Sequence, residues 1–426
     1  MKKAVVMVLT LILCLGMTVL PAFAAGGQVI EYSWYREGAT RPSGTLSSAS
    51  FEDGWNDIME KCNGGFEVQV KLMGDWIADG GRFTDDVFNG PGFEDDIIRI
   101  REGASVVLDL NGYSIDRGVI DSIKNGEVIH LEQGASLTLK NGTVIGSVHI
   151  TGGKDATFQN CTFKDNEDID FGAAIYAEAC DRITVETCIF TNLEDDSHGA
   201  GIEAFGTELT VIGSVFQQCT SEHDGGAIYL KDSTADMTNC QFVGGSAANG
   251  GAVALENTEA MFAHCTFGNN EAKGNAGALS VKGTEAKTEL YLCNLADNTA
   301  WENGGAIAVA ETANVILYGC IVDENNAING GAAYMGQDAT VEVLDYNDEL
   351  AKDVYPTLFT NNKATEKGDV FFVDTPDGGI EEGSDFQEEA PGSAVPVNNG
   401  LGITELCLGG AVIFMVIVLY LNIKKK

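Results

Sequence analysis

Gly225-Gly226-Ala227-Ile228 is the stretch of sequence that decides the fold, because it recurs along the chain at a nearly constant spacing. Close copies start at residues 250, 304 and 330, and looser copies start at residues 172, 199 and 276. Successive starting points are 27, 26, 25, 26, 28 and 26 residues apart. So regular a period predicts a solenoid in which each repeat forms one coil.

A second landmark recurs in the same phase: a cysteine followed two residues later by an apolar residue, usually phenylalanine. Side chains two positions apart on a strand point the same way, so both are predicted to enter the coil interior. The predicted core ladder comprises Cys161, Cys188, Cys240, Cys265, Cys293, Cys320, Phe163, Phe190, Phe216, Phe242 and Phe267.

The segments between turns alternate apolar and polar residues, as in Ser-Leu-Thr-Leu-Lys at 136–140. This period of two favours strands over a helical hairpin of the same repeat length. Asn270, Asn298 and Asn325 each follow a cysteine by five residues and predict a ladder of inward amides at a turn. We therefore predict an all-β fold, a single-stranded right-handed parallel β-helix of about 26 residues per coil. It should occupy residues 66–373, with coils about 4.8 Å apart.

A short capping helix is predicted within an N-terminal cap region at residues 26–65. Ser50 precedes apolar residues at positions 51, 55, 58 and 59, which is the pattern of a capped amphipathic helix. An open solenoid end exposes both core and strand edges, so this helix is predicted to cover the first coil.

The eleven cysteines raise the question of a disulfide framework. Six of them recur at the coil period, which predicts stacked free thiols that behave as small apolar core residues. Disulfides between one or two pairs of neighbouring coils are the open alternative. Because the sequence has no Cys-x-x-Cys pair, a structural zinc site is not expected.

The two ends of the chain predict its compartment. Residues 1–25 contain two lysines, then an apolar run, then a cleavage site of small residues. This order is the pattern of a secretory signal peptide. An acidic linker rich in proline and glycine at 374–400 leads to an apolar segment at 401–423, a predicted transmembrane helix, and a basic tail at 424–426. The positive-inside rule places the tail in the cytoplasm, so we predict a single-pass cell-membrane protein with an extracellular ectodomain.

The chain carries 63 acidic and 25 basic residues, a net charge of −38. Such a field repels nucleic acid, which is therefore not an expected partner.

Acidic and histidine side chains gather just before three successive copies of the glycine landmark, in a turn predicted to face outward. Hard carboxylate oxygens suit calcium there, and the two histidines would allow zinc or another transition metal. The alternatives are an ordinary solvated acidic turn, or a catalytic carboxylate pair at Asp196 and Glu222. No cofactor is certain. The candidate metal ligands are Asp168, Asp170, Asp195, Asp196, His198, Glu222, His223 and Asp224.

Three segments, Phe163-Lys-Asp-Asn166, Phe267-Gly-Asn-Asn270 and Phe359-Thr-Asn-Asn362, alternate with the glycine landmark. Over residues 160–373 this alternation resembles the repeats of chlamydial polymorphic membrane proteins, a family of β-helical adhesins. The resemblance implies an adhesin-like binding or structural protein whose partner is a cell-surface or extracellular glycan or protein.

The architecture also resembles the pectate-lyase-like superfamily, which includes polysaccharide lyases and hydrolases. A glycan-active enzyme is therefore the alternative function. Lyases need a base beside a carboxylate and cations for an acidic sugar chain, yet the few basic residues between positions 165 and 346 lie at different phases of the repeat. The sequence therefore assigns no catalytic residue and leans away from an enzyme.

Overall fold

The computed structural model describes residues 29–77, 93–94, 97–117, 126–164, 172–284, 286–348 and 353–373. These residues all belong to the first of two compact units, Met1–Gly383 and Ser384–Lys426. The predicted signal peptide, linker, transmembrane helix and basic tail lie outside the described residues. Within the described ranges, no helix is both long and apolar enough to cross a bilayer.

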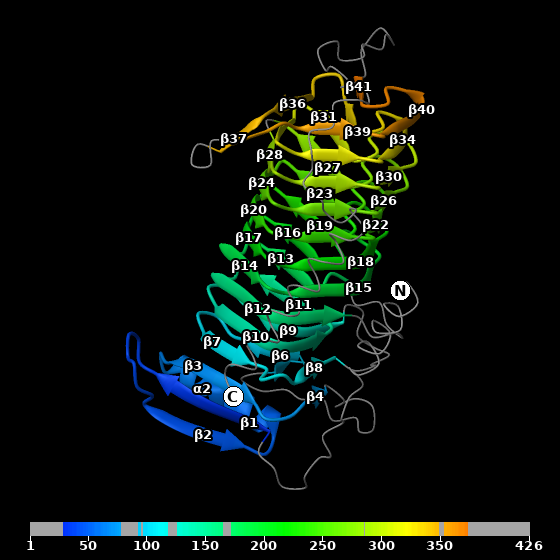
Figure 1. The fold of residues 1–426 in the computed structure, drawn as a ribbon. Coiled ribbons are helices and arrows are strands. Elements are labelled where there is room, and N and C mark those ends of the chain that lie inside the picture. The colour runs from blue at the N-terminus through cyan, green and yellow to red at the C-terminus, as the bar shows by residue number, and fades with distance from the viewer. Residues whose placement is uncertain are drawn as a thin grey trace, which may run out of the picture. The chain divides into compact units, whose positions relative to one another are not determined.

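The described chain winds into a parallel β-solenoid whose coils stack one above another (Figure 1). Each regular coil contributes three strand segments, and each segment pairs in parallel with its counterparts in the coils before and after. This arrangement confirms the predicted all-β solenoid and its coil period.

The first face of the solenoid is formed by β3 (Glu67–Leu72), β7 (Ser105–Asp109), β14 (Arg182–Glu186), β17 (Glu208–Ile212), β20 (Thr234–Thr238), β24 (Glu259–Ala263), β28 (Lys287–Tyr291), β32 (Asn314–Tyr318) and β36 (Thr340–Leu344). The second is formed by β4 (Trp76–Ile77), β8 (Ser114–Asp116), β15 (Ile189–Asp195), β18 (Val215–Ser221), β21 (Gln241–Val243), β25 (Thr266–Gly268), β29 (Asn294–Ala296), β33 (Ile321–Asp323) and β39 (Leu358–Thr360). Short strands continue it past a turn: β22 (Ser246–Ala247), β26 (Glu271–Ala272), β30 (Thr299–Ala300), β34 (Asn326–Asn329) and β40 (Lys363–Lys367). Because β10 (Ser136–Ile145) and β12 (Asp155–Lys164) run across both faces, the two form one sheet.

The third face is a separate twelve-stranded sheet. In spatial order it contains β5 (Phe93–Glu94), β6 (Ile97–Ile100), β9 (Glu127–Leu131), β11 (Ser147–Thr151), β13 (Ile175–Glu178), β16 (Ile202–Phe205), β19 (Ile228–Lys231), β23 (Val253–Glu256), β27 (Leu279–Gly283), β31 (Ile307–Glu311), β35 (Ala333–Met335) and β41 (Phe371–Val373).

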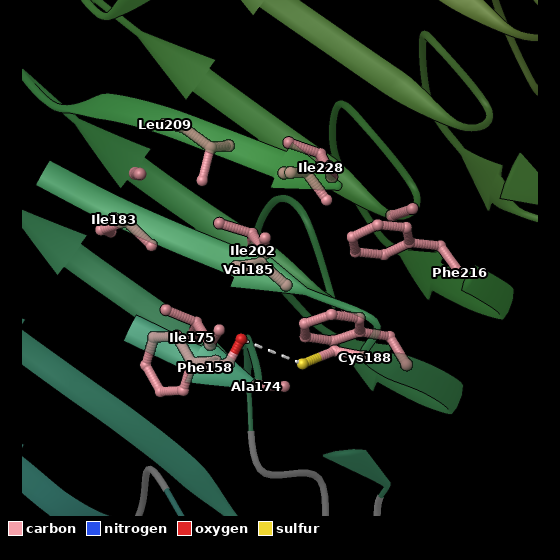
Figure 2. Close-up of a cluster of buried hydrophobic side chains, with 14 of the residues drawn as sticks. Phe158, Ala174, Ile175, Ile183, Val185, Cys188, Ile202, Leu209, Phe216 and Ile228 are labelled. Carbon is pink, nitrogen blue, oxygen red and sulfur yellow. Dashed lines mark hydrogen bonds between the residues drawn. The ribbon is translucent and has the colours of Figure 1, made fainter. Parts of the chain in front are cut away.

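The core runs the length of the stack, and every residue of the predicted core ladder is at most 1% exposed. The in-phase phenylalanines stack ring on ring, with 4.5 Å between the centroids of Phe190 and Phe216 and 5.0 Å between those of Phe216 and Phe242. Figure 2 shows part of this core, in which the Sγ of Cys188 donates to the carbonyl oxygen of Phe158 at 3.4 Å. Cys240, Cys265, Cys293 and Cys320 make the same contact with the coil before them. All nine cysteines of the described ranges are free thiols.

The predicted asparagine ladder is present at the turn of the second face. The Nδ2 of Asn270 donates to Asn298 Oδ1, that of Asn298 to Asn325 Oδ1, and that of Asn325 to Asn362 Oδ1, each at 2.9 Å. All four side chains are buried, so the ladder satisfies polar groups that water cannot reach.

The double-glycine landmark lies in the turn that leads into the twelve-stranded sheet. Gly250 has a φ of 62°, which favours glycine, and a Cβ on Gly251 would overlap the carbonyl oxygen of Gly277 in the next coil. The landmark recurs because the coils could not stack this closely around a larger residue.

The N-terminal end is closed by α2 (Phe51–Asn63), which confirms the predicted capping helix. Ser50 is its N-cap and accepts a hydrogen bond from the backbone of Asp53 at 3.1 Å. Two strands that the sequence analysis did not predict, β1 (Ile30–Tyr35) and β2 (Gly44–Ser48), complete the cap, and β1 pairs antiparallel with β3. The edge of the first coil is thereby covered.

Near the other end, the coil that follows β36 is lengthened by an antiparallel hairpin of β37 (Tyr346–Asp348) and β38 (Asp353–Tyr355).

Candidate binding face

The parallel register of the twelve-stranded sheet, which shifts only at Ser147 where β11 pairs with β9, aligns one outward residue from each strand between β6 and β41. These residues form a single file along the solenoid, and many of them carry rings. The file contains Arg99, His130, His149, Tyr176, Glu203, Tyr229, Ala254, Ser280, Ala308, Tyr334 and Phe372.

Rings from this file and its neighbours make a continuous aromatic row, defined here as His149, Tyr176, Phe205, Tyr229 and His198. The centroid distances are 5.2 Å from His149 to Tyr176, 6.0 Å from Tyr176 to Phe205 and 6.0 Å from Phe205 to Tyr229. His198 stacks on Tyr229 at 4.3 Å and covers it, while the other four rings are partly buried.

A charged network continues from the end of the row. Glu256 on β23 accepts hydrogen bonds from Tyr229 (2.9 Å) and pairs with Lys231 (2.6 Å) and Lys282 (3.0 Å). Burial raises the pKa of Glu256, but these three hydrogen bonds outweigh burial and lower the pKa to about 2. Glu256 is therefore ionised at every physiological pH.

Asp224 links the network to the turn before the sheet. Its Oδ2 lies 3.3 Å from Lys282 Nζ, its Oδ1 accepts from Asn249 Nδ2 at 2.9 Å, and its backbone N–H donates to His198 Nδ1 at 3.0 Å. Since Nδ1 of His198 is the acceptor, the neutral imidazole carries its proton on Nε2.

Two carboxyl groups beside the aromatic row are buried, Glu203 on β16 and Asp195 at the end of β15. In the sheet register Glu203 lies between Tyr176 and Tyr229. Burial, together with the charges of Asp195 and Glu178, raises the pKa of Glu203 to about 8. Glu203 is therefore largely protonated at neutral pH.

A groove of about 170 Å³ opens on this sheet between β23 and β35. Ser280 and Ala308 line its floor, Asn249 and Asn275 one side, and Lys282 the other. The ring of Tyr334 lies at one end.

The structure brings some of the predicted metal ligands together and leaves others apart. His198 and His223 lie with ring centroids 5.1 Å apart, while Asp196 and Glu222 are exposed. The turn was predicted to face outward, which is wrong for Asp195, whose side chain is only 6% exposed. Its Oδ1 turns back to accept the backbone N–H of Ser197.

Asp168 and Asp170 lie outside the described residues. In the part of the chain that is described, no three His, Cys, Asp or Glu side chains are grouped so as to hold a metal ion. Calcium or zinc binding here stays a prediction, and calorimetric titration with both ions tests it.

The outward file was missed at the sequence level, although a signal for it exists. Tyr176, Glu203 and Tyr229 are 27 and 26 residues apart, which is the coil period. Following that period at outward as well as inward positions would have found the row.

Comparison with known proteins gives three results. A family model described as the right handed beta helix region matches residues 104–267 and 146–345. No curated protein sequence matches the chain. A crystal structure of PfbA, a surface adhesin of Streptococcus pneumoniae, is similar at 13% sequence identity with a TM-score of 0.34. That alignment covers 79% of this chain and 92% of PfbA.

The two family matches together span residues 104–345, which is more than half of the 426 residues. They contain most of the parallel coils described above. This chain belongs to the right-handed β-helix family.

Proposed function

We propose that this chain is an adhesin-like surface protein that binds an extracellular glycan along the outer face of its twelve-stranded sheet. The aromatic row is the observation that carries the proposal. Sugar rings stack their C–H faces on aromatic rings, and their hydroxyl groups bind carboxylates and amides. Solenoids build extended binding surfaces of this kind from aligned positions of successive coils.

The polar surroundings of the row support the same function. Half-exposed rings next to fixed charged and amide groups are typical of ligand sites, in which a few polar groups set the orientation of the ligand. The apolar segments at residues 4–20 and 401–423 support display of the solenoid outside the cell membrane. The net charge of −38 speaks against a nucleic-acid partner.

Binding of the full-length chain to a glycan array tests the proposal. Tyr176→Ala should weaken binding about fivefold, because one stacked ring contributes roughly 1 kcal/mol. Tyr318→Ala is the matched control, since Tyr318 is also half-exposed and stacks on Tyr291 at 4.5 Å, but on the first face. Absence of binding to every glycan, or equal losses in the two variants, would contradict the proposal.

Cleavage of the bound glycan is a second candidate, and Glu203 is the observation that favours it. A general acid must be protonated at the working pH, and a carboxyl group with a pKa of about 8 meets this requirement beside the aromatic row. The test is release of reducing ends from any glycan that binds. Turnover that disappears in Glu203→Gln would support cleavage, and binding without turnover would leave a pure binding protein.

A further inference from the structure

The last coil of the solenoid differs from the first in how its outer edge is covered. Its strands β36, β39, β40 and β41 pair with the coil before them, and no strand of the described residues pairs with their other edge. At the opposite end of the stack, α2, β1 and β2 cover the first coil (Figure 1). Within the described part of the chain, the solenoid therefore has one covered end and one open end.

The core loses part of its cover at this open end. Val315 and Leu317 on β32 are fully buried, whereas Val341 and Val343, their register partners on β36, are half-buried. Phe359 on β39 is half-buried as well. Apolar side chains that fill the interior elsewhere therefore meet solvent here, and covering them would be favourable.

Backbone groups of β36 also point out of the open end. The N–H of Thr340 donates to the carbonyl oxygen of Ala313 in the coil before, at 3.0 Å, and the carbonyl oxygen of Leu344 accepts from Gly319 of that coil at 3.1 Å. Successive residues of a strand direct their backbone groups to opposite sides, so those of Val341 and Val343 face away from the stack. Such an edge is a template for pairing with another strand.

The sequence that follows β41 is unsuited to form a further coil. A strand of the first face supplies two apolar inward residues, as Val341 and Val343 do on β36. Residues 374–382 contain four acidic residues, one proline and a single large apolar residue, Ile380. No register of this segment fills both inward positions, and the proline would interrupt a ladder. The cover must therefore come from elsewhere.

The charges of β40 are complementary to those of the same strand read in reverse. When two copies of β40 lie antiparallel with Lys363 opposite Glu366, symmetry places the Glu366 of the first copy opposite the Lys363 of the second. Both residues are exposed, and β36, β39, β40 and β41 together contain two basic and two acidic residues. The turns and the hairpin of this coil add the acidic residues Asp338, Asp345, Asp348, Asp353 and Asp369.

We infer that the open end binds the open end of a second copy of the chain, so that two solenoids join tail to tail. The same surface serves both copies, and the contact closes at two. A head-to-tail contact would instead place these strands on the cap of α2, β1 and β2, which already covers a core. The dimer does not depend on the proposed glycan binding, because the open end and the outer face of the twelve-stranded sheet are different surfaces.

The first test is the mass of the full-length chain in a mild detergent, measured by sedimentation equilibrium. The buffer contains 0.15 M salt, because at this ionic strength the repulsion between acidic residues more than about 8 Å apart is largely screened. We expect twice the mass of one chain. Amine cross-linking of mixed ¹⁴N and ¹⁵N chains should join Lys363 and Lys367 of different copies, without links from either lysine to Lys61 or Lys71 at the covered end.

The second test reverses charges on β40. Lys363→Glu turns two symmetric attractions into repulsions and should weaken the dimer about tenfold. The double variant Lys363→Glu, Glu366→Lys restores opposite charges and should recover the affinity of the wild type. Lys273→Glu reverses an exposed charge in the middle of the stack and should leave the affinity unchanged. Circular dichroism of each variant shows that its fold is retained.

Three results would overturn the tail-to-tail dimer. One is a wild-type chain that stays monomeric, which would leave the open end to another partner. Another is a dimer that Lys363→Glu does not weaken, since a contact through the apolar segment at 401–423 would survive this change. The third is cross-linking of Lys363 to Lys61 or Lys71, which would indicate a head-to-tail assembly.

Discussion

Asn298 makes four side-chain hydrogen bonds inside the coil stack. Its Oδ1 accepts from the backbone N–H of Asn270 at 3.1 Å and from Asn270 Nδ2 at 2.9 Å. Its Nδ2 donates to the carbonyl oxygen of Phe267 at 3.1 Å and to Asn325 Oδ1 at 2.9 Å. The side-chain amide of Asn298 therefore links three coils. It contributes to stability because it completes the hydrogen bonds of buried donors and acceptors in the coils on both sides.

Asn298→Ala should lower the free energy of unfolding by about 3 kcal/mol or more, because it leaves buried donors and acceptors on both sides unpaired. Asn326→Ala is the control. Asn326 is exposed, and its side chain bonds to the nearby carbonyl oxygen of Glu324. Urea unfolding followed by circular dichroism measures both variants. A loss of equal size in the two would contradict a special role for the buried ladder.

Glu203 should make stability depend on pH. Its pKa rises from 4.5 to about 8 on folding, so the folded state binds the proton more tightly than the unfolded state. The corresponding stability is fully present below about pH 4.5 and is lost as pH rises to 8, by about 5 kcal/mol at most. Glu203→Gln mimics the protonated form and should remove this loss.

The two proteins should therefore be about equally stable near pH 5, and the glutamine variant should be more stable above pH 8. Thermal unfolding at several pH values measures the difference. Glu222→Gln, at an exposed position of the neighbouring turn, should leave the pH profile as it is in the wild type. Parallel profiles for wild type and Glu203→Gln would contradict the assignment.

At the scale of the element, the turn into the twelve-stranded sheet leaves no room for a side chain at its second glycine. A Cβ on Gly251 would overlap backbone atoms of Gly277 and Glu271, and neither segment can move without breaking hydrogen bonds between coils. Gly251→Ala should therefore cost more than about 2 kcal/mol of unfolding free energy. Gly74→Ala is the control, because a Cβ there meets nothing within 4 Å. A Gly251→Ala melting temperature equal to that of the control would show that the coils tolerate a wider turn.

The same constraint explains why so much of the fold was predictable from the sequence. Each inward landmark meets a physical requirement that recurs in every coil. Glycine is needed where two backbones come close together, phenylalanine fills the core, and asparagine binds the backbone where the chain bends. Ser50 and the apolar spacing after it likewise predicted α2, since local capping needs no tertiary context.

The elements that escaped prediction depend on partners distant in sequence. The strands β1 and β2 occur once and follow no coil period, so only their pairing with β3 reveals them. Asp195 was expected at the surface because it belongs to the acidic turn before the glycine landmark, yet its position at the end of β15 turns it inward. The proposed binding face was not predicted for another reason. Its outward residues differ from coil to coil, so only the strand register shows that they lie side by side.

At the scale of the whole molecule, one architecture serves both stability and the proposed binding. The inward positions repeat nearly unchanged and hold the stack together. The outward positions are free to vary, and on the twelve-stranded sheet they change from a row of rings to a groove and back to a ring within a few coils. A substitution on this face should therefore affect binding more than folding, and Tyr176→Ala tests this expectation.

The apolar segment near the C-terminus is expected to hold the molecule at the cell surface. Residues 401–423 would rise roughly 35 Å as a helix, enough to cross the hydrocarbon core of a bilayer. Deleting residues 401–426 should therefore move the chain from the membrane fraction into the medium, as followed by immunoblotting of fractionated cells. Deleting residues 384–400 shortens the linker but keeps the apolar segment, so that variant should stay with the membrane.

Protease added to intact cells should likewise release a large fragment cut within residues 374–400. Retention of the chain that lacks 401–426, or protection of the whole chain from protease, would rule out display by a C-terminal anchor.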